Sequence, residues 1–121
     1  MRLDKALEGI EKHKEALREG SASNPSYISE HTYLLAQYIS LAEDELSELE
    51  SSIIRKEADS FKKYVSSGKS ANAAKESLKR EFIEERAQII KVSRLVSGGW
   101  KLVSENQSRV KHLIAEANNQ I

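Results

Sequence analysis

The chain has 121 residues, with 19 Lys/Arg and 19 Asp/Glu, so its formal net charge is zero at pH 7. It contains no Cys, which excludes disulfide, thiolate–metal and Cys-nucleophile chemistry for these residues. No apolar run approaches the roughly 20 residues that span a membrane, and the acidic, amphipathic start is unlike a signal peptide. Ala, Glu, Lys, Leu and Arg make up 59 residues, a composition typical of long helices. We therefore expect an all-α, soluble, cytoplasmic protein with one domain, residues 1–121.

The first predicted element is a short N-terminal helix within residues 1–20. Leu3, Leu7, Ile10 and Leu17 share one face of this helix, and charged residues occupy the other face. Gly20 is a suitable C-terminal stop, and residues 21–25 then form a short linker. Asn24 can cap the next helix, and Pro25 suits its first turn.

The second predicted element is a long helix over residues 25–65. Its apolar and small residues recur at alternating steps of four and three, which is the spacing of a heptad seam. The seam positions are Ile28, Thr32, Leu35, Ile39, Ala42, Leu46, Leu49 and Ile53. The seam ends at Lys56 and Ser60, and the apolar residues that follow lie on a shifted face, which indicates a stutter.

Residues 66–70 are polar and contain Gly68, which predicts the tip of a helical hairpin. Ser70 is a good N-cap for a second long helix over residues 70–118, whose apolar residues keep one heptad frame through Gly98 and Gly99. We therefore expect a long antiparallel, coiled-coil-like hairpin with an added short N-terminal helix. Each Gly inside the helix costs about 1 kcal/mol, so another helix, either the N-terminal one or that of a second subunit, should pack closely there. A break at Gly98–Gly99, giving four helices, is the alternative.

A hairpin of this size buries too small a core to be stable alone, so we expect a homo-oligomer. The seam and its counterpart on the second long helix are the expected oligomer interface: Leu35, Ile39, Leu46, Leu49, Ile53, Val92, Val96 and Gly99. Trp100 is expected in the core.

Charge is divided unevenly along the chain. Residues 1–61 carry 7 Lys/Arg and 13 Asp/Glu, whereas residues 62–121 carry 12 and 6. A basic track of this kind can neutralise backbone phosphates, and a Tyr beside it can stack on an unpaired base. The expected nucleic-acid-binding residues are Lys62, Lys63, Tyr64, Lys69, Lys75, Lys79, Arg80, Lys91 and Arg94. Two other interpretations are a solvated helix face paired with local Glu residues, and an arm that attracts acidic faces of neighbouring subunits.

Catalytic and cofactor motifs are missing from the sequence. The acidic run between Glu43 and Glu50 lacks the His residues of a di-iron motif, and Gly68–Lys69–Ser70 lacks the glycine and the strand of a phosphate-binding loop. We therefore expect no enzyme activity, no cofactor, no metal and no small-molecule substrate.

The order of these features resembles the UvsY-like family, the small all-helical recombination mediators of T-even-type phages. Met1-Arg2-Leu3 opens an amphipathic helix, Lys62, Lys63 and Tyr64 precede a Ser67-Gly68-Lys69 turn, and the late segment holds Trp100, Ser97-Gly98, Ser108-Arg109 and Lys111-His112. The resemblance implies binding of single-stranded DNA, ring-like homo-oligomers, and loading of a RecA-type recombinase onto strands coated by single-strand-binding protein, in a host cell cytoplasm. Lys62 matches one of the family's DNA-contacting basic residues, whereas Ser60 stands where the family has an earlier one.

The alternative function is a helical protein-interaction module with no nucleic-acid role, such as an adaptor, a chaperone, or a phage assembly or inhibitor protein. It would hold a partner helix on the long apolar faces.

Overall fold

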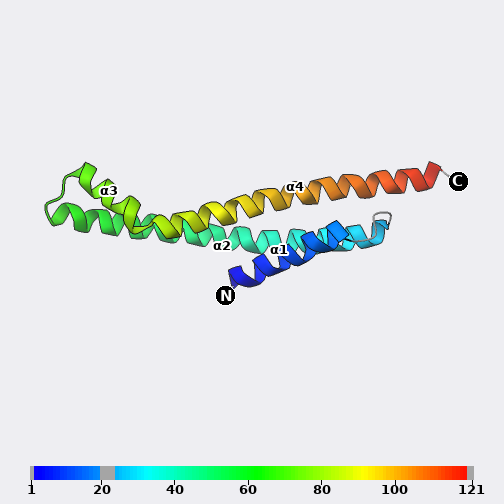
Figure 1. Cartoon of the computed structure of the whole chain (residues 1–121), viewed down its shortest axis with the longest axis horizontal. Coiled ribbons are helices and arrows are strands. Elements are labelled where there is room, and N and C mark those ends of the chain that lie inside the picture. Colours follow the sequence, from blue (N-terminus) through cyan, green and yellow to red (C-terminus); the bar gives the residue numbers. More distant parts are fainter. Residues whose placement is uncertain (1, 20–23, 120–121) are drawn as a thin grey trace. The chain divides into compact units, whose positions relative to one another are not determined.

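The protein is all-α, as the sequence predicts. A computed structural model describes residues 2–19 and 24–119, which form α1 (Arg2–Glu19), α2 (Pro25–Ser66), α3 (Ala71–Glu81) and α4 (Ile83–Asn119), with no strand among them (Figure 1). Met1, the expected stop at Gly20 and most of the expected linker lie outside the described residues. None of the helices in the described ranges has the length and hydropathy of a membrane-spanning segment.

The chain packs as two units, and each is described by itself. One unit contains Met1–Glu45 and Arg94–Ile121, and the other contains Leu46–Ser93. Each of the long helices α2 and α4 has one part in the first unit and one part in the second.

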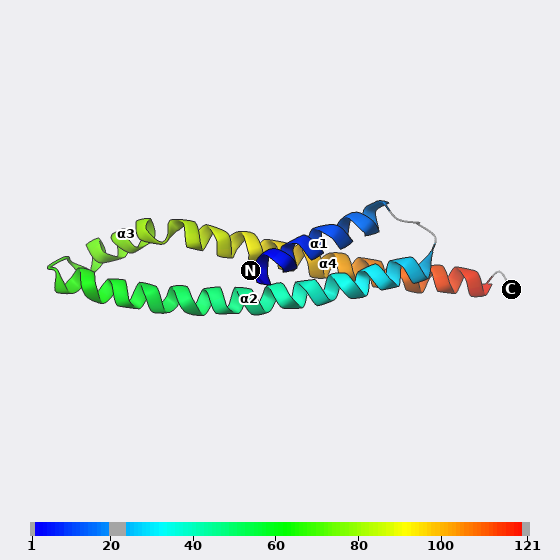
Figure 2. The same ribbon diagram turned by 90° about the horizontal axis from the view of Figure 1, so that it is seen from below.

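The first unit packs α1 against the early part of α2 and the late part of α4 (Figure 2). Its buried apolar side chains follow the spacing seen in the sequence: Leu3, Ala6, Ile10 and Leu17 from α1, Ile28, Leu35, Ile39 and Ala42 from α2, and Val96 and Val103 from α4. Gly9 leaves room for the ring of Tyr38, which lies where a Cβ would stand. The predicted seam positions Ile28, Thr32, Leu35, Ile39 and Ala42 are therefore all buried in this unit.

Polar contacts fix α1 on α2. Nδ1 of His13 lies 2.9 Å from Nδ1 of His31, and the Tyr27 hydroxyl donates a hydrogen bond of 3.1 Å to the Ala16 carbonyl. Asn24 accepts from the Tyr27 amide at 3.2 Å, so the predicted cap of α2 is present. His13 is also stacked on Tyr38, with ring centroids 5.6 Å apart. Together these contacts place a buried imidazole at the centre of the α1–α2 interface.

The His13–His31 contact makes the packing of α1 sensitive to pH. A hydrogen bond between two imidazole nitrogens needs one nitrogen without a proton. The bond is therefore lost when both rings are protonated and charged. Burial lowers the pKa of His13, the adjacent His31 and Lys12 lower it further, and Glu30 partly opposes them. Because the folded pKa lies below that of the unfolded chain, the unfolded state takes up its proton first as the pH falls.

We therefore expect stability to fall as the pH drops below about 6.5, the unperturbed value for His. Urea unfolding at pH 7.5 and 5.5, followed by circular dichroism, measures this loss. His13→Gln should reduce the difference between the two pH values. The exposed His112, which contacts Glu116, supplies the control His112→Gln, which should leave the difference unchanged. An equal pH dependence in all three proteins would contradict the assignment.

α4 continues through Gly98 and Gly99, so the expected uninterrupted helix is found at that point and the alternative break is absent. Gly99 is buried, and a Cβ there would lie 2.6 Å from Cδ1 of Ile39. The helix that approaches Gly99 is thus α2 of the same chain, rather than the N-terminal helix or a second subunit. No atom lies within 4 Å of a Cβ built on Gly98.

Trp100 is not in the core. Its side chain is 37% exposed, and its indole N–H donates to Glu43 of α2. The polar edge of the indole explains this position, because a buried N–H needs an acceptor and the acidic run of α2 supplies one at the surface.

The second unit contains the end of α2, all of α3 and the start of α4, and Figure 1 shows α3 beside the end of α2. Its buried apolar side chains are Ile53, Ala74, Phe82 and Val92. The predicted turn has Gly68 with φ of 103°, a left-handed conformation that glycine adopts without steric cost. Ser70 caps α3 as predicted, since its hydroxyl accepts from the Ala73 amide at 3.2 Å.

The expectation of one helix over residues 70–118 is wrong near its start. The helix breaks at Phe82, where φ is −109° and ψ is 20°, and α4 begins at Ile83. Ala74, Leu78 and Phe82 are spaced by four, so on an ideal helix their stripe drifts by about 40° at each step. With the break at Phe82, Ala74 of α3, Phe82 itself and Val92 of α4 are all buried.

The residues expected at an oligomer interface are largely buried inside one chain. Leu35, Ile39, Ile53, Val92, Val96 and Gly99 are buried, and Leu46 and Leu49 are half-buried. An interface between copies on this face would require the chain to open, so the seam is the intramolecular core. The heptad pattern identified the packed face correctly but did not show which helix covers it.

Candidate nucleic-acid interface

The most basic stretch of the chain runs from Lys62 to Arg80, across the turn between α2 and α3. It holds six Lys/Arg and one Glu. The stretch belongs wholly to the unit Leu46–Ser93. All six of its basic residues are exposed: Lys62, Lys63, Lys69, Lys75, Lys79 and Arg80.

Most of these cations have no carboxylate partner. Within the described part of the chain, the only ion pair in this set joins Lys79 to Glu76, at 3.3 Å. If the basic stretch were a solvated helix face of the expected kind, local Glu residues would neutralise it. In the structure they do not. The charge remains available to an external anion.

Tyr64 lies at the centre of the contacts that hold the two sides of the turn together. Its hydroxyl donates to Glu81 of α3 at 2.7 Å, and Ser60 donates to the same carboxylate at 3.2 Å. The hydrogen bond to Glu81 raises the pKa of Tyr64, because it favours the protonated phenol. Ser60 and Tyr64 thus anchor α3 to α2 through one carboxylate.

Lys69 reaches back across the turn. Its Nζ donates to the Ser77 hydroxyl at 2.8 Å and lies 4.8 Å from the centroid of the Tyr64 ring. The ammonium group therefore covers part of the ring that the sequence suggested as a stacking surface for a base. A base that stacks there would have to displace Lys69, or use the opposite face of the ring.

Two of these cations also line a hollow between the helices of this unit. Lys75, Leu78 and Lys79 come from α3, and the hollow is completed by Arg86 of α4 and Glu57 of α2. Arg86 pairs with Glu57, and this contact raises the pKa of the guanidinium. Sequence reasoning did not select Arg86, and its i,i+7 spacing from Lys79 was the signal that could have found it.

Lys91 and Arg94 are both exposed on α4. Lys91 belongs to the same unit as the turn, whereas Arg94 belongs to the other unit. The structure therefore brings Lys62, Lys63, Tyr64, Lys69, Lys75, Lys79, Arg80 and Lys91 into one unit and does not place Arg94 with them.

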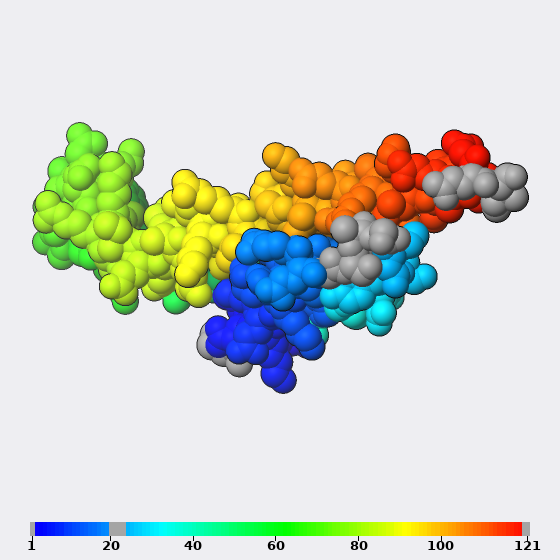
Figure 3. All heavy atoms as spheres, turned by 45° about the vertical axis from the view of Figure 1, so that its right-hand side comes forward, coloured from blue at the N-terminus to red at the C-terminus, as the bar shows by residue number. Residues whose placement is uncertain are grey.

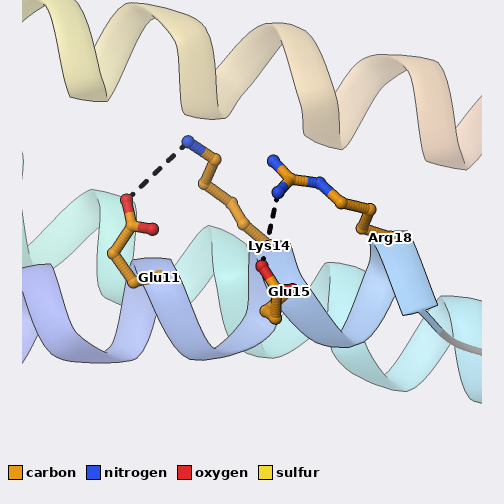
Figure 4. Close-up of polar contacts among 4 residues, drawn as sticks. All are labelled: Glu11, Lys14, Glu15 and Arg18. Carbon is orange, nitrogen blue, oxygen red and sulfur yellow. Dashed lines mark hydrogen bonds and ion pairs between the residues drawn. The ribbon is translucent and has the colours of Figure 1, made fainter.

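The later basic residues of α4 lie in a separate hollow of the first unit. Lys101 and Arg109 line it together with Lys14 and Arg18 of α1, which lies against α4 (Figure 3). Glu11 holds Lys14 at 3.8 Å and Glu15 holds Arg18 at 3.4 Å (Figure 4). These carboxylates offset the α1 cations, so this hollow is a weaker anion site than the stretch from Lys62 to Arg80.

Comparison with protein-family models, with curated proteins and with solved structures found no match to this chain.

Proposed function

We propose that this protein is a non-enzymatic, single-stranded-DNA-binding recombination mediator that forms homo-oligomers and helps to load a RecA-type recombinase. One observation carries the proposal: the exposed stretch Lys62–Arg80 has six basic residues, and in the described chain only Lys79 has a carboxylate partner. An unneutralised basic surface on a protein of zero net charge is suited to a polyanion.

A single strand is the proposed form of the nucleic acid because Tyr64 lies among the cations. Cations that track a phosphate backbone, combined with an aromatic ring for an unpaired base, are typical of single-strand binding without sequence preference. A hairpin with the turn at residues 66–70 as its tip would present the end of α2 and the start of α3 to the same strand. The role in loading a recombinase, in the presence of single-strand-binding protein, rests on the resemblance to UvsY-like proteins.

The test is the salt dependence of binding to a fluorescent oligothymidylate, followed by fluorescence anisotropy. For single strands, log K falls against log salt with a slope of about −0.7 per phosphate neutralised. Lys62→Ala with Lys63→Ala should therefore weaken binding at low salt and make the slope shallower by about 1.4.

The matched control is Lys5→Ala with Lys12→Ala, two exposed lysines of α1 that make no ion pair in the described chain. This control should leave affinity and slope unchanged. Absence of binding at low salt, or equal losses in the two double variants, would rule out the proposed site.

The second candidate function is the protein-interaction module without a nucleic-acid role. The observation that favours it is a hollow between α2 and α4 lined by Thr32, Tyr33, Ala36 and Val110, with Tyr33 63% exposed. Such a groove suits the apolar face of a partner helix. If wild type and the Lys62/Lys63 variant retain the same single protein in equal amounts, the result would support this function over the first.

A further inference from the structure

The start of α4 carries an apolar stripe on the side that faces away from the core. Ile83 is 65% exposed and Ile90 is 51% exposed, and the exposed Ala87 lies between them. These residues recur at steps of four and three, so they form one continuous face of the helix. The buried Val92 lies on the opposite side of the same helix. Because the two large aliphatic side chains share one face, they form a contiguous apolar row that could serve as a contact surface.

The two edges of this stripe differ in their charges. On the edge towards α2, Arg86 pairs with Glu57 inside the chain. On the other edge, Glu84 and Lys91 are exposed and seven residues apart, and neither makes an ion pair with the described residues. The charge on the edge towards α2 is therefore neutralised within the chain, whereas the other edge carries one negative and one positive charge for a binding partner.

We propose that this surface of α4 binds the same surface of a second copy, with the two helices antiparallel about a two-fold axis. In that arrangement Ile90 packs on the small Ala87 of the second copy, and Ala87 receives Ile90 in return. Glu84 then lies beside Lys91 of the second copy, and Lys91 beside its Glu84, so the surface is complementary to itself in size and in charge.

The charge pattern selects the antiparallel arrangement. In a parallel pair, the residues that flank the seam would bring Arg86 of one helix beside Lys91 of the other, and these charges repel. The inference rests on the homo-oligomer of the proposed function and deepens it by naming the contact. The face is short, so it belongs to the small, reversible class of interfaces.

The first test measures self-association by sedimentation velocity over a range of protein concentrations, without DNA. Wild type should form a reversible dimer or a multiple of it. Ile83→Glu with Ile90→Glu should raise the dissociation constant at least about tenfold, a change of about 1.4 kcal/mol. The control is Ile54→Glu, which places the same charge on an isoleucine of α2 that is 66% exposed, and it should leave association unchanged.

The second test distinguishes the two orientations. Lys91→Glu should weaken the antiparallel pair, because it sets a carboxylate at position 91 beside Glu84 of the second copy, and adding Glu84→Lys should restore it. In a parallel pair the same Lys91→Glu change would strengthen association, by placing a carboxylate beside Arg86.

A covalent readout is available because the chain has no Cys. A mixture of Glu84→Cys and Lys91→Cys chains should oxidise to a disulfide-linked heterodimer, whereas each variant alone should not cross-link. The proposal would be overturned by a wild type that is monomeric. It would also be overturned if Ile54→Glu weakened self-association as much as the Ile83/Ile90 double variant, or if Lys91→Glu strengthened it. Failure of DNA binding would leave all of these readouts unaffected, so the two proposals fail separately.

Discussion

Phe82→Ala is expected to destabilise the unit Leu46–Ser93 by about 3–5 kcal/mol, which is the usual cost of truncating a buried aromatic side chain. Phe82 is 6% exposed, and it is the largest of the buried apolar side chains in that unit, the others being Ile53, Ala74 and Val92. With so few buried residues, the unit has little surplus stability to offset the loss. Hydrogen exchange measures the effect directly, and amides of α3 should lose protection more than those of α1.

An exposed isoleucine of the same unit supplies a matched control for this substitution. Ile54 is 66% exposed, so Ile54→Ala should change stability by no more than about 0.5 kcal/mol. Equal losses at the two positions, or loss of protection spread evenly over the chain, would show that Phe82 is not the centre of this unit's core.

Phe82 also shows where helical periodicity stops being informative. The pattern placed Val92 on an apolar, packed face and Ser70 at a cap; Val92 is buried and Ser70 caps α3, because burial and capping depend on local spacing. It did not locate the break between α3 and α4. Apolar residues spaced by four are compatible with one continuous helix, on which they form a drifting stripe, and equally with two helices of different direction. Only the position of the opposing helix decides between these.

The oligomer prediction was limited in the same way. Leu35 and Ile39 were recognised as a packed face, but a heptad pattern does not distinguish a helix of the same chain from one of another. In the structure that face is buried within the chain, whereas Ile83 and Ile90, which lie outside the predicted interface set, are exposed. Exposure depends on which helices meet, and sequence spacing does not supply it.

For the candidate interface, the sequence could predict the excess of positive charge and the turn that carries it. It could not predict the pairing of those charges. Tyr64 and Ser60 both donate to Glu81, which leaves the cations of α3 without that carboxylate, and Lys69 covers part of the Tyr64 ring. The two bonds to Glu81 join residues 17 and 21 positions apart across the turn, so they depend on the register of the two helices.

Gly98 and Gly99 are adjacent in one helix, yet they have opposite environments. A Cβ on Gly99 would lie 2.6 Å from Cδ1 and 2.9 Å from Cγ1 of Ile39, both well inside contact distance, whereas a Cβ on Gly98 would meet no atom within 4 Å. Ile39 is fully buried, so it has little room to move away from a new side chain. The absence of a side chain at Gly99 is thus what allows α2 and α4 to approach each other in this unit.

Gly99→Leu is therefore expected to destabilise the protein by about 2–3 kcal/mol, because overpacking a closely packed contact outweighs the gain in helix propensity. Gly98→Ala should have the opposite sign and stabilise by about 0.5–1 kcal/mol, since it removes the conformational cost of glycine in an exposed helix position. Urea unfolding followed by circular dichroism measures both changes. Combining Gly99→Leu with Ile39→Ala should recover part of the loss, because the smaller side chain makes room for the leucine; additive losses would show that Ile39 is not what Gly99 accommodates.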